Sequence, residues 1–352
     1  DTITPSLVRY RDFLRDTYRP RARATIALSA LPDGLACYTA LLRAHSTLER
    51  TPREVYETGE RTVAANEERV RALGRELFGT DDLGTILARV ESAPDNRFAS
   101  ADEVLAHARE SMARARERTA TVFETMPPQD AVVEPLEEHL RGSGMASHYE
   151  ANPDDAQPGV YRINLDHPEA ERRGRAEITL VHEAWPGHHL QIAIARGLPG
   201  MHPFSALAGN SAYVEGWARY AEALAEEAGI YRSKYALVTR RIWPARAMVV
   251  DPGIHAFGWS RERAVAYLLA TGRFTDATAN ELVDRIAAMP GQATAYDAGA
   301  LALFALREQA ERELGPRFDL KRFHTQLLSD GVVPLALLRS RVEAWIADEP
   351  ER

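Results

Sequence analysis

The sequence contains very little cysteine and very little lysine. Cys37 is the single cysteine among 352 residues, and Lys234 and Lys321 are the only lysines. One cysteine excludes an internal disulfide and a cysteine-based metal cluster, so Cys37 is expected to be a small buried residue. The arginines, which supply nearly all the positive charge, are scattered among acidic residues. Scattered charges of both signs are typical of solvated helix faces.

Long apolar runs and an excess of positive charge are also absent. No stretch approaches the roughly eighteen apolar residues of a membrane-spanning helix, and the N-terminal residues lack the basic-then-apolar order of a signal peptide. The net charge of −8 argues against a nucleic-acid partner. We therefore expect no membrane span and favour a cytoplasmic location. Secretion stays open, because a chain that begins at Asp1 could have lost a leader or a preceding domain.

The spacing of apolar residues divides the chain into three parts. From 1 to 125 they recur every three or four positions, which predicts helices. Between about 127 and 166, short runs rich in Val, Ile and Tyr alternate with turn residues, which predicts a small antiparallel sheet. From 170 onward helical spacing returns. The sequence thus predicts a mostly α protein with a single domain over 1–352, which could follow a preceding domain in a longer protein.

The stretch HEAWPGHH at residues 182–189 begins like the zinc-protease motif H-E-x-x-H but has the wrong spacing. On a continuous helix His182 and His188 would lie about 120° out of phase, and His189 would share a face with His182 at a distance of roughly 10 Å along the axis. Zinc binds imidazole nitrogens at about 2.0–2.1 Å. An unbroken helix therefore excludes a shared metal ion.

Pro186 and Gly187 are the residues that could break this helix, because proline lacks a backbone donor and glycine frees the backbone. If Trp185 and Pro186 loop out, the remaining sequence reads H-E-A-G-H. The motif is then intact apart from a two-residue bulge. The resulting assignments are His182 and His188 as metal ligands, Glu183 as general base and His189 as the reserve ligand.

A third ligand is expected on the next predicted helix, NSAYVEGWARYAEALAEEAG, which Asn210 or Ser211 can cap. Glu215 lies one turn into this helix, and Glu222 lies on the same face two turns later. We assign Glu215 as the ligand and place Glu222 behind the ligands. Both could instead be ordinary glutamates on an exposed helix face.

Five blocks in this order resemble a large bacterial family, the domain-of-unknown-function family 885. They are LVHEAWPGHHLQ, AYVEGWARYAE, VVDPGIHAFGWSRERAVAYL, MPGQATAYDAGALALFALRE and LGPRFDLKRFHTQLLSDGVVPL. The chain departs from the family pattern at DPG, where D-T-G is usual, and at Ile286, where tyrosine is usual. The family is in turn similar to helical zinc peptidases such as thimet oligopeptidase, angiotensin-converting enzyme and carboxypeptidase Taq. That resemblance implies an active site in a groove between helical halves, with Glu215 as the third ligand.

Peptide hydrolysis also needs donors for the oxyanion and groups that bind the substrate. His255 and Tyr296 lie in blocks dense with turn residues and are the candidate donors, although core packing explains such residues equally well. Asp251 is placed behind the ligands. The candidates for binding a substrate carboxylate are Arg246, Arg285 and Arg307.

The leading hypothesis is a hydrolase of short peptides that holds one Zn²⁺ per chain. One alternative keeps the metal and acts on an amide-containing small metabolite, and another is a helical interaction protein with a vestigial site. A di-iron carboxylate bundle is excluded, because it requires two E-x-x-H pairs and the chain contains none.

Overall fold

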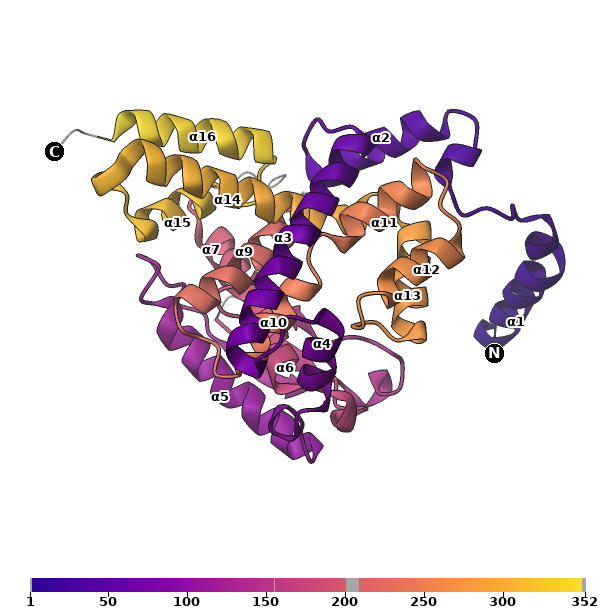
Figure 1. The fold of residues 1–352 in the computed structure, drawn as a ribbon, viewed down its shortest axis with the longest axis horizontal. Helices are drawn as coiled ribbons and strands as arrows, with labels where there is room; N and C mark the ends of the chain where they lie inside the picture. Colours follow the sequence, from indigo (N-terminus) through magenta and orange to yellow (C-terminus); the bar gives the residue numbers. More distant parts are fainter. Residues whose placement is uncertain (1, 155, 201–208, 350–352) are drawn as a thin grey trace.

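The computed structural model describes residues 2–154, 156–200 and 209–349, and it is mostly helical, as predicted (Figure 1). The first part contains α1 (Ile3–Phe13), α2 (Gly34–Ser46), α3 (Pro52–Phe78), α4 (Leu83–Ser92) and α5 (Ala101–Thr119). The strands are β1 (Ala131–Pro135), β2 (His148–Glu150) and β3 (Gly159–Ile163). The remaining helices are α6 (Arg173–Glu183), α7 (His188–Gly197), α9 (Ser211–Glu227), α10 (Lys234–Ile242), α11 (Arg246–His255), α12 (Arg261–Leu269), α13 (Asp276–Ala288), α14 (Ala295–Leu314), α15 (Leu320–Leu328) and α16 (Leu335–Asp348).

The small sheet lies where the sequence predicts it, but it is mixed rather than antiparallel. β3 is central: it pairs with β2 in antiparallel fashion and with β1 in parallel, so the strand order is β1-β3-β2. A parallel pair requires a connection of about a dozen residues or more, and residues 136–158 between β1 and β3 provide it. The prediction of an antiparallel sheet was wrong on this point, because alternating polarity does not distinguish strand directions.

Helix α2 corrects a second expectation. Its buried residues are Gly34, Tyr38, Leu42 and Ser46, which recur every four positions and define one buried stripe. Cys37 lies outside this stripe and is exposed. Its burial was predicted from residue type alone, whereas its position on the helix decides its exposure.

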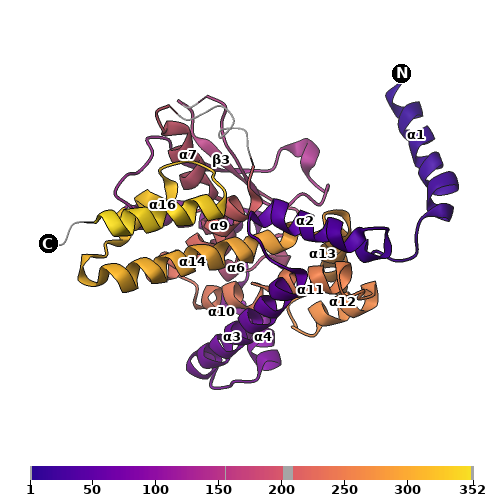
Figure 2. The same cartoon turned by 90° about the horizontal axis from the view of Figure 1, so that it is seen from above.

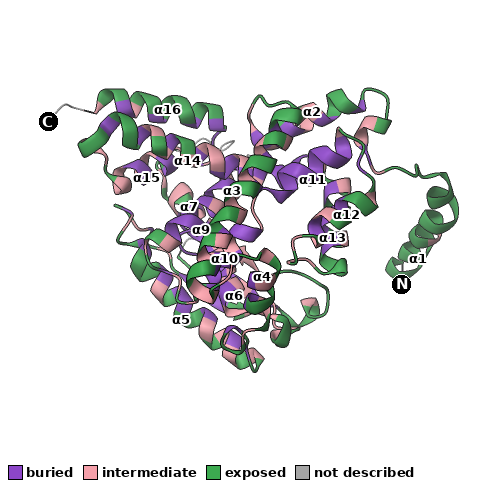
Figure 3. Cartoon of the chain, in the orientation of Figure 1, coloured by how far each residue is buried: buried purple, intermediate pink, exposed green. Residues whose placement is uncertain are grey.

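The buried side chains form two large clusters on either side of the molecule. One joins α5, the sheet, α6, α7, α9 and α14 to α16, and the other joins α2, α3 and α11 to α13. Figure 3 shows that α9 and α11 are largely buried, whereas α2 and α16 each expose one face. Helix α1 has no buried residue and projects from the body, as Figures 1 and 2 show.

In the described part of the chain, no helix combines the length and the apolar character needed to cross a membrane.

A candidate metal centre and the cavity beside it

The hydrogen bonds between α6 and α7 contain the predicted two-residue interruption. The backbone amide of Gly187 donates to the carbonyl of Val181 at 3.1 Å, and that of Leu190 donates to Ala184 at 3.4 Å. Both bonds span six residues, whereas an α-helix spans four. Two extra residues are therefore accommodated within one interrupted helix, and the backbone resumes its helical course at α7.

One hydrogen bond and one restriction on space fix the conformation of the interruption. The indole Nε1 of Trp217 on α9 donates to the carbonyl oxygen of Pro186 at 2.9 Å. At Gly187, a side chain would begin only 2.0 Å from the carbonyl oxygen of His182. Position 187 therefore requires glycine for lack of space.

The interruption brings His182, His188 and Glu215 together. One potential ligand atom from each residue lies within 4.8 Å of the others. Glu215 Oε2 is 3.4 Å from His182 Nε2 and 3.5 Å from His188 Nε2. Ligand atoms arranged tetrahedrally at about 2.0–2.1 Å from zinc would be about 3.3–3.4 Å apart. The two distances to the Glu215 carboxylate therefore match those around a shared zinc ion.

One unsatisfied polar atom supports the same interpretation. Glu215 Oε2, which faces both imidazoles, is buried and has no hydrogen-bond partner among the residues that the structure describes. A buried polar atom without a partner costs about 1–3 kcal/mol, and native proteins contain few of them. A cation between the two imidazoles and the carboxylate would satisfy the Glu215 oxygen.

A second carboxylate orients His182. Glu222 Oε1 is 2.8 Å from His182 Nδ1, which directs the opposite nitrogen toward Glu215. The Nη1 atom of Arg219 donates to both oxygens of Glu222 at 2.9 Å. Burial lowers the pKa of His182, but Glu215 and Glu222 outweigh it and raise this pKa to about 9. For Glu215, burial raises the pKa, but the two imidazoles hold it well below its usual range.

The position of Glu215 depends on how α9 packs. The side chain of Asn210 caps this helix by accepting from the amides of Ala212 and Tyr213. One residue after the glutamate, Gly216 lies against Gly299 of α14, where an added Cβ would come within 2.6 Å of backbone. This close approach of two backbones sets α14 beside the ligand cluster.

Tyr296, near the start of α14, lies beside the cluster as a result. Its ring is stacked near that of His182, with centroids 6.3 Å apart. Burial and the Glu215 carboxylate raise the pKa of its phenol. Arg285 Nη2 donates to the Tyr296 hydroxyl oxygen at 3.0 Å. The phenol is therefore a protonated donor held next to the candidate metal site.

Glu183 is fixed by the edge strand of the sheet. The backbone amide of Tyr149 on β2 donates to Glu183 Oε2 at 2.9 Å. Glu183 and His182 both line a cavity of about 320 Å³, which also contacts α10, α13 and α14. The cavity lies between helices of both halves, with α6 and α9 on one side and α11 and α13 on the other.

Asp251 and His255 lie elsewhere, against expectation. Asp251 accepts hydrogen bonds from the Tyr38 hydroxyl at 2.7 Å and from the Gly291 amide at 3.0 Å, and burial raises its pKa to about 7. His255 accepts from the Leu28 amide at 3.2 Å and donates to the Ile286 carbonyl at 3.0 Å. Both side chains are fully buried in the other large cluster and do not line the cavity. We therefore correct their roles to structural ones.

Three further candidates also have structural partners. His189 contacts the Tyr149 hydroxyl at 2.9 Å and the Gln129 carbonyl at 3.3 Å, so it is not a ligand. Arg246 pairs with Glu67 at 2.8 Å, and Arg307 pairs with Glu227 at 2.8 Å. Neither arginine lines the cavity, whereas Arg285 does. Of the three predicted substrate-binding arginines, only Arg285 lies at the site.

Some residues of the site escaped the sequence analysis. Arg219 follows Glu215 by four positions, so helical spacing could have identified it. Arg175 precedes His182 by seven positions on α6, so helical spacing could have identified it as well. The Tyr149 amide and Arg273 carry no such signal, because they come from a strand and from the loop before α13. Only packing places the amide against Glu183 and Arg273 at the cavity.

Comparison with known proteins identifies the family. The profile of the family described as "Bacterial protein of unknown function (DUF885)" matches residues 1–342, and the chain therefore belongs to this family. No curated protein matches the chain.

Two solved structures match the fold. A Colwellia psychrerythraea protein described as a "putative lipoprotein" has a TM-score of 0.85 and 28% identity, over 93% of this chain and 58% of its own length. A Shewanella oneidensis protein, described as a "putative lipoprotein of unknown function", has a TM-score of 0.78 and 20% identity, over 96% of this chain and 63% of its own. The chain thus spans about three fifths of each matched structure.

Proposed function

We propose that this member of the DUF885 family hydrolyses peptide bonds in short peptides and holds one zinc ion per chain. The observation that carries this proposal is the cluster of His182, His188 and Glu215, formed across an interrupted helix. Glu183 faces the same cavity. This set of side chains supplies three ligands and one neighbouring base, which is what metal-assisted hydrolysis needs.

Zinc bound to the two imidazoles and the carboxylate would supply Lewis acidity toward a substrate carbonyl. Glu183 acts as the general base and takes a proton from the attacking water. The Tyr149 amide occupies one oxygen of this carboxylate and fixes its direction. The second oxygen is left for the proton.

Tyr296 donates a hydrogen bond to the oxygen on which negative charge develops. Its raised pKa keeps the phenol protonated at neutral pH. Arg285 donates to the phenol oxygen, and the phenol proton faces the Glu215 carboxylate, from which it would turn to the substrate oxygen. Tyr296 and Arg285 therefore replace the two donors expected from the sequence, Tyr296 and His255.

The shape of the site supports short peptides as substrates. The cavity of about 320 Å³ adjoins a second one of about 650 Å³, and both lie between helices. Together they accommodate a few extended residues, whereas a folded protein surface would be held away by the surrounding helices.

Two measurements test the proposal. Protein purified without added metal should contain about one zinc per chain by elemental analysis, whereas a vestigial site would hold none. A mixed library of short peptides, analysed by mass spectrometry with and without chelator, should then reveal metal-dependent cleavage. A protein that contains zinc but leaves every peptide intact would favour the alternative of an amide-containing metabolite.

We also propose an envelope location in place of the cytoplasmic one. The Colwellia protein, which shares 28% of its residues with this chain, is described as a "putative lipoprotein". Fractionation of cells that express the natural protein would test this, and recovery only in the cytosol would contradict it.

A further inference from the structure

Two cavities meet beside the candidate metal centre, and arginines line the junction. The cavity that contains His182 and the larger one next to it share five lining residues: Arg175, Trp243, Arg273, Leu282 and Arg285. Three of the five carry a guanidinium group. In a chain with a net charge of −8, this junction is a local concentration of positive charge.

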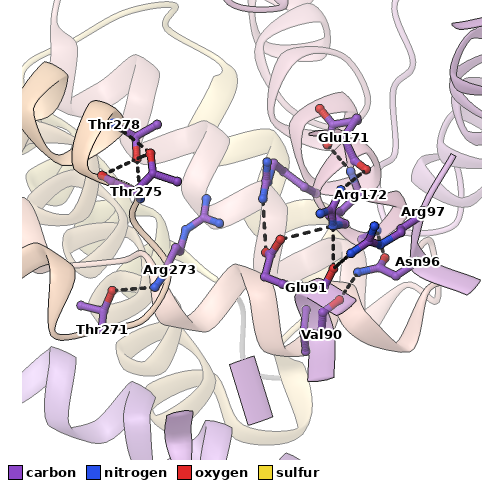
Figure 4. Close-up of polar contacts among 12 residues, drawn as sticks. Val90, Glu91, Asn96, Arg97, Glu171, Arg172, Thr271, Arg273, Thr275 and Thr278 are labelled. Atoms are coloured by element: carbon purple, nitrogen blue, oxygen red, sulfur yellow. Dashed lines mark hydrogen bonds and ion pairs between the residues drawn. The ribbon is translucent and has the colours of Figure 1, made fainter. Parts of the chain in front are cut away.

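Arg273 is the least satisfied of the three. Its Nε is buried without a hydrogen-bond partner in the described chain, and no described carboxylate forms an ion pair with it. Figure 4 shows its side chain extending from the loop before α13 into the space between Thr275 and Glu91, with a dashed line only at its backbone nitrogen. Burial and the nearby Arg175 lower the pKa of Arg273 to about 10.

The two arginines beside Arg273 are not fully paired with carboxylates either. Arg285 Nη2 donates to two uncharged groups, Gln292 Oε1 at 2.9 Å and the Tyr296 hydroxyl at 3.0 Å. Arg175 Nη2 is 3.3 Å from Glu91 Oε1, and its Nε is buried without a partner in the part of the chain that is described. The same Glu91 also pairs with Arg172 at 3.2 Å.

Arginines elsewhere in the molecule are paired. Arg307 contacts Glu227 at 2.8 Å and Glu311 at 2.9 Å. Arg240 and Arg241 divide the two oxygens of Glu226 between them. Arg175 and Arg273 are half-buried and Arg285 is exposed, so all three guanidinium groups can be reached from the cavities that they line. Because three guanidinium groups meet there and Glu91 pairs with only one of them, the junction attracts an anion from outside the chain.

We infer that Arg273, together with Arg175 and Arg285, forms a subsite for a carboxylate of the peptide substrate. A guanidinium group binds a carboxylate through two parallel hydrogen bonds, a geometry that the compact ammonium group of lysine does not offer. The inference deepens the proposed function and rests on it, because it names the substrate class of the same site: short peptides that carry a carboxylate.

The distance along α6 sets the position of that carboxylate. Arg175 precedes His182 by seven residues, which corresponds to about 10.5 Å of helix. An extended peptide covers about 3.3–3.6 Å per residue. The carboxylate therefore lies two or three residues from the cleaved bond. A C-terminal carboxylate and an aspartate or glutamate side chain offer the same chemistry at that point.

Binding to a hydrolytically blocked protein tests this inference without turnover. Zinc-loaded Glu183→Gln protein would be titrated calorimetrically with three acetylated probes: trialanine with a free C-terminus, trialanine amide, and Ala-Ala-Glu amide. Trialanine with a free C-terminus and Ala-Ala-Glu amide each carry one carboxylate that the arginines can bind, whereas trialanine amide carries none. We expect at least one carboxylate probe to bind about ten- to a hundredfold more tightly than trialanine amide.

The arginine variants assign the effect to the subsite. Adding Arg273→Gln should abolish the preference for a carboxylate, while Arg307→Gln, an arginine paired outside the cavity, should leave it unchanged. Equal affinities for all three probes, or no binding of any probe, would overturn the inference. This comparison does not depend on the arginine variants, so it stands even if Arg273→Gln fails to fold.

The outcomes also separate this inference from the proposed function. Cleavage of peptides by the wild-type protein without any carboxylate preference would refute the subsite and keep the peptidase. A carboxylate preference in binding, without cleavage of any peptide by the wild-type protein, would refute the peptidase and keep the subsite. The tighter of the two carboxylate probes identifies whether the site selects a chain terminus or an acidic side chain.

Discussion

Two polar clusters in this protein have similar composition and opposite character. One contains His182, Glu215 and Tyr296, and the other contains His255, Asp251 and Tyr38. In the second cluster both ring nitrogens of the histidine have backbone partners, and the aspartate accepts from a tyrosine and an amide. In the first, the Glu215 Oε2 atom has no hydrogen-bond partner in the described chain and faces two imidazole nitrogens at 3.4 and 3.5 Å.

The difference teaches how to separate a functional cluster from a structural one: the candidate site is half-buried and incompletely hydrogen-bonded, whereas the Asp251 cluster is fully buried and satisfied. A satisfied network is complete within the chain and needs nothing more. A network with an unpaired buried oxygen between two imidazoles is complete only with an additional ion. Variants of the two clusters should therefore affect different measurements: metal and catalysis for the first, stability for the second.

The largest effect is expected from Glu183→Gln. The amide retains the shape of the side chain but cannot accept a proton from water, so hydrolysis should fall by about 10²- to 10⁴-fold. Zinc content and melting temperature should stay at wild-type values. Steady-state cleavage of a peptide found in the library digest measures the effect, and wild-type turnover would disprove the role of general base.

Glu215→Ala should remove most of the zinc, because it deletes one of three protein ligands and leaves an incomplete set. Elemental analysis after dialysis measures the loss. His189→Ala is the matched control and should retain zinc, since the imidazole of His189 is held by Tyr149 and Gln129. The reverse pattern would show that His189 is a ligand and that Glu215 is not.

Glu222→Gln should weaken zinc binding by about ten- to a hundredfold without abolishing it. The glutamate orients His182 through Nδ1 and contacts no other ligand, and substitutions behind metal ligands have effects of this size. Competition with a chelator of known affinity provides the measurement. An unchanged affinity would mean that packing alone orients the imidazole.

His255→Ala should affect stability alone. It creates a cavity and leaves the Leu28 amide and the Ile286 carbonyl without their partner, which we expect to cost about 2–3 kcal/mol of unfolding free energy. Denaturant unfolding gives the value, and zinc content should not change. Loss of zinc in a protein of normal stability would return His255 to the active site.

The last prediction concerns the pH dependence of stability. The pKa of Asp251 is raised from 3.8 to about 7 in the folded protein, so the folded state binds this proton more tightly than the unfolded state does. Its contribution to stability is complete below about pH 4 and is lost as the pH rises through about 7. Asp251→Asn should remove this dependence. The fall in melting temperature between pH 5 and pH 8 should therefore be smaller in the variant than in the wild type. An equal fall in both proteins would exclude Asp251 as the cause.

Several features could be predicted from sequence because they depend on neighbours within one or two helical turns. Thr51 and Glu54 form a complete capping box at the start of α3, from residues three positions apart. Pro186 and Gly187 break the helix where an intact one would exclude a metal site. Glu215 and its cap follow from the spacing on one helix. In each case the physical cause lies within the segment itself.

Other features could not be predicted, because they depend on segments far apart in the chain. Asp251 and His255 have the residue types of an active site, but packing against α2 and the loop at Gly291 turns them into a satisfied core network. Arg246 and Arg307 resemble Arg285 in sequence and differ only in whether a glutamate lies nearby. The parallel pairing of β1 with β3 likewise depends on the path of residues 136–158.

The sequence by itself determined the helical class, the interrupted helix and the three candidate ligands, since periodicity, helix breaking and ligand spacing act over a few residues. Only the tertiary structure decided which buried polar groups are complete and which need an outside partner. Whether the charge of Arg273 is neutralised depends on which side chains the fold brings within about 4 Å of its guanidinium group. The side chains around Arg273 belong to helices that are distant in sequence. Hydrogen bonding and ion pairing act at contact distance, and contact between distant segments is set by packing of the whole domain.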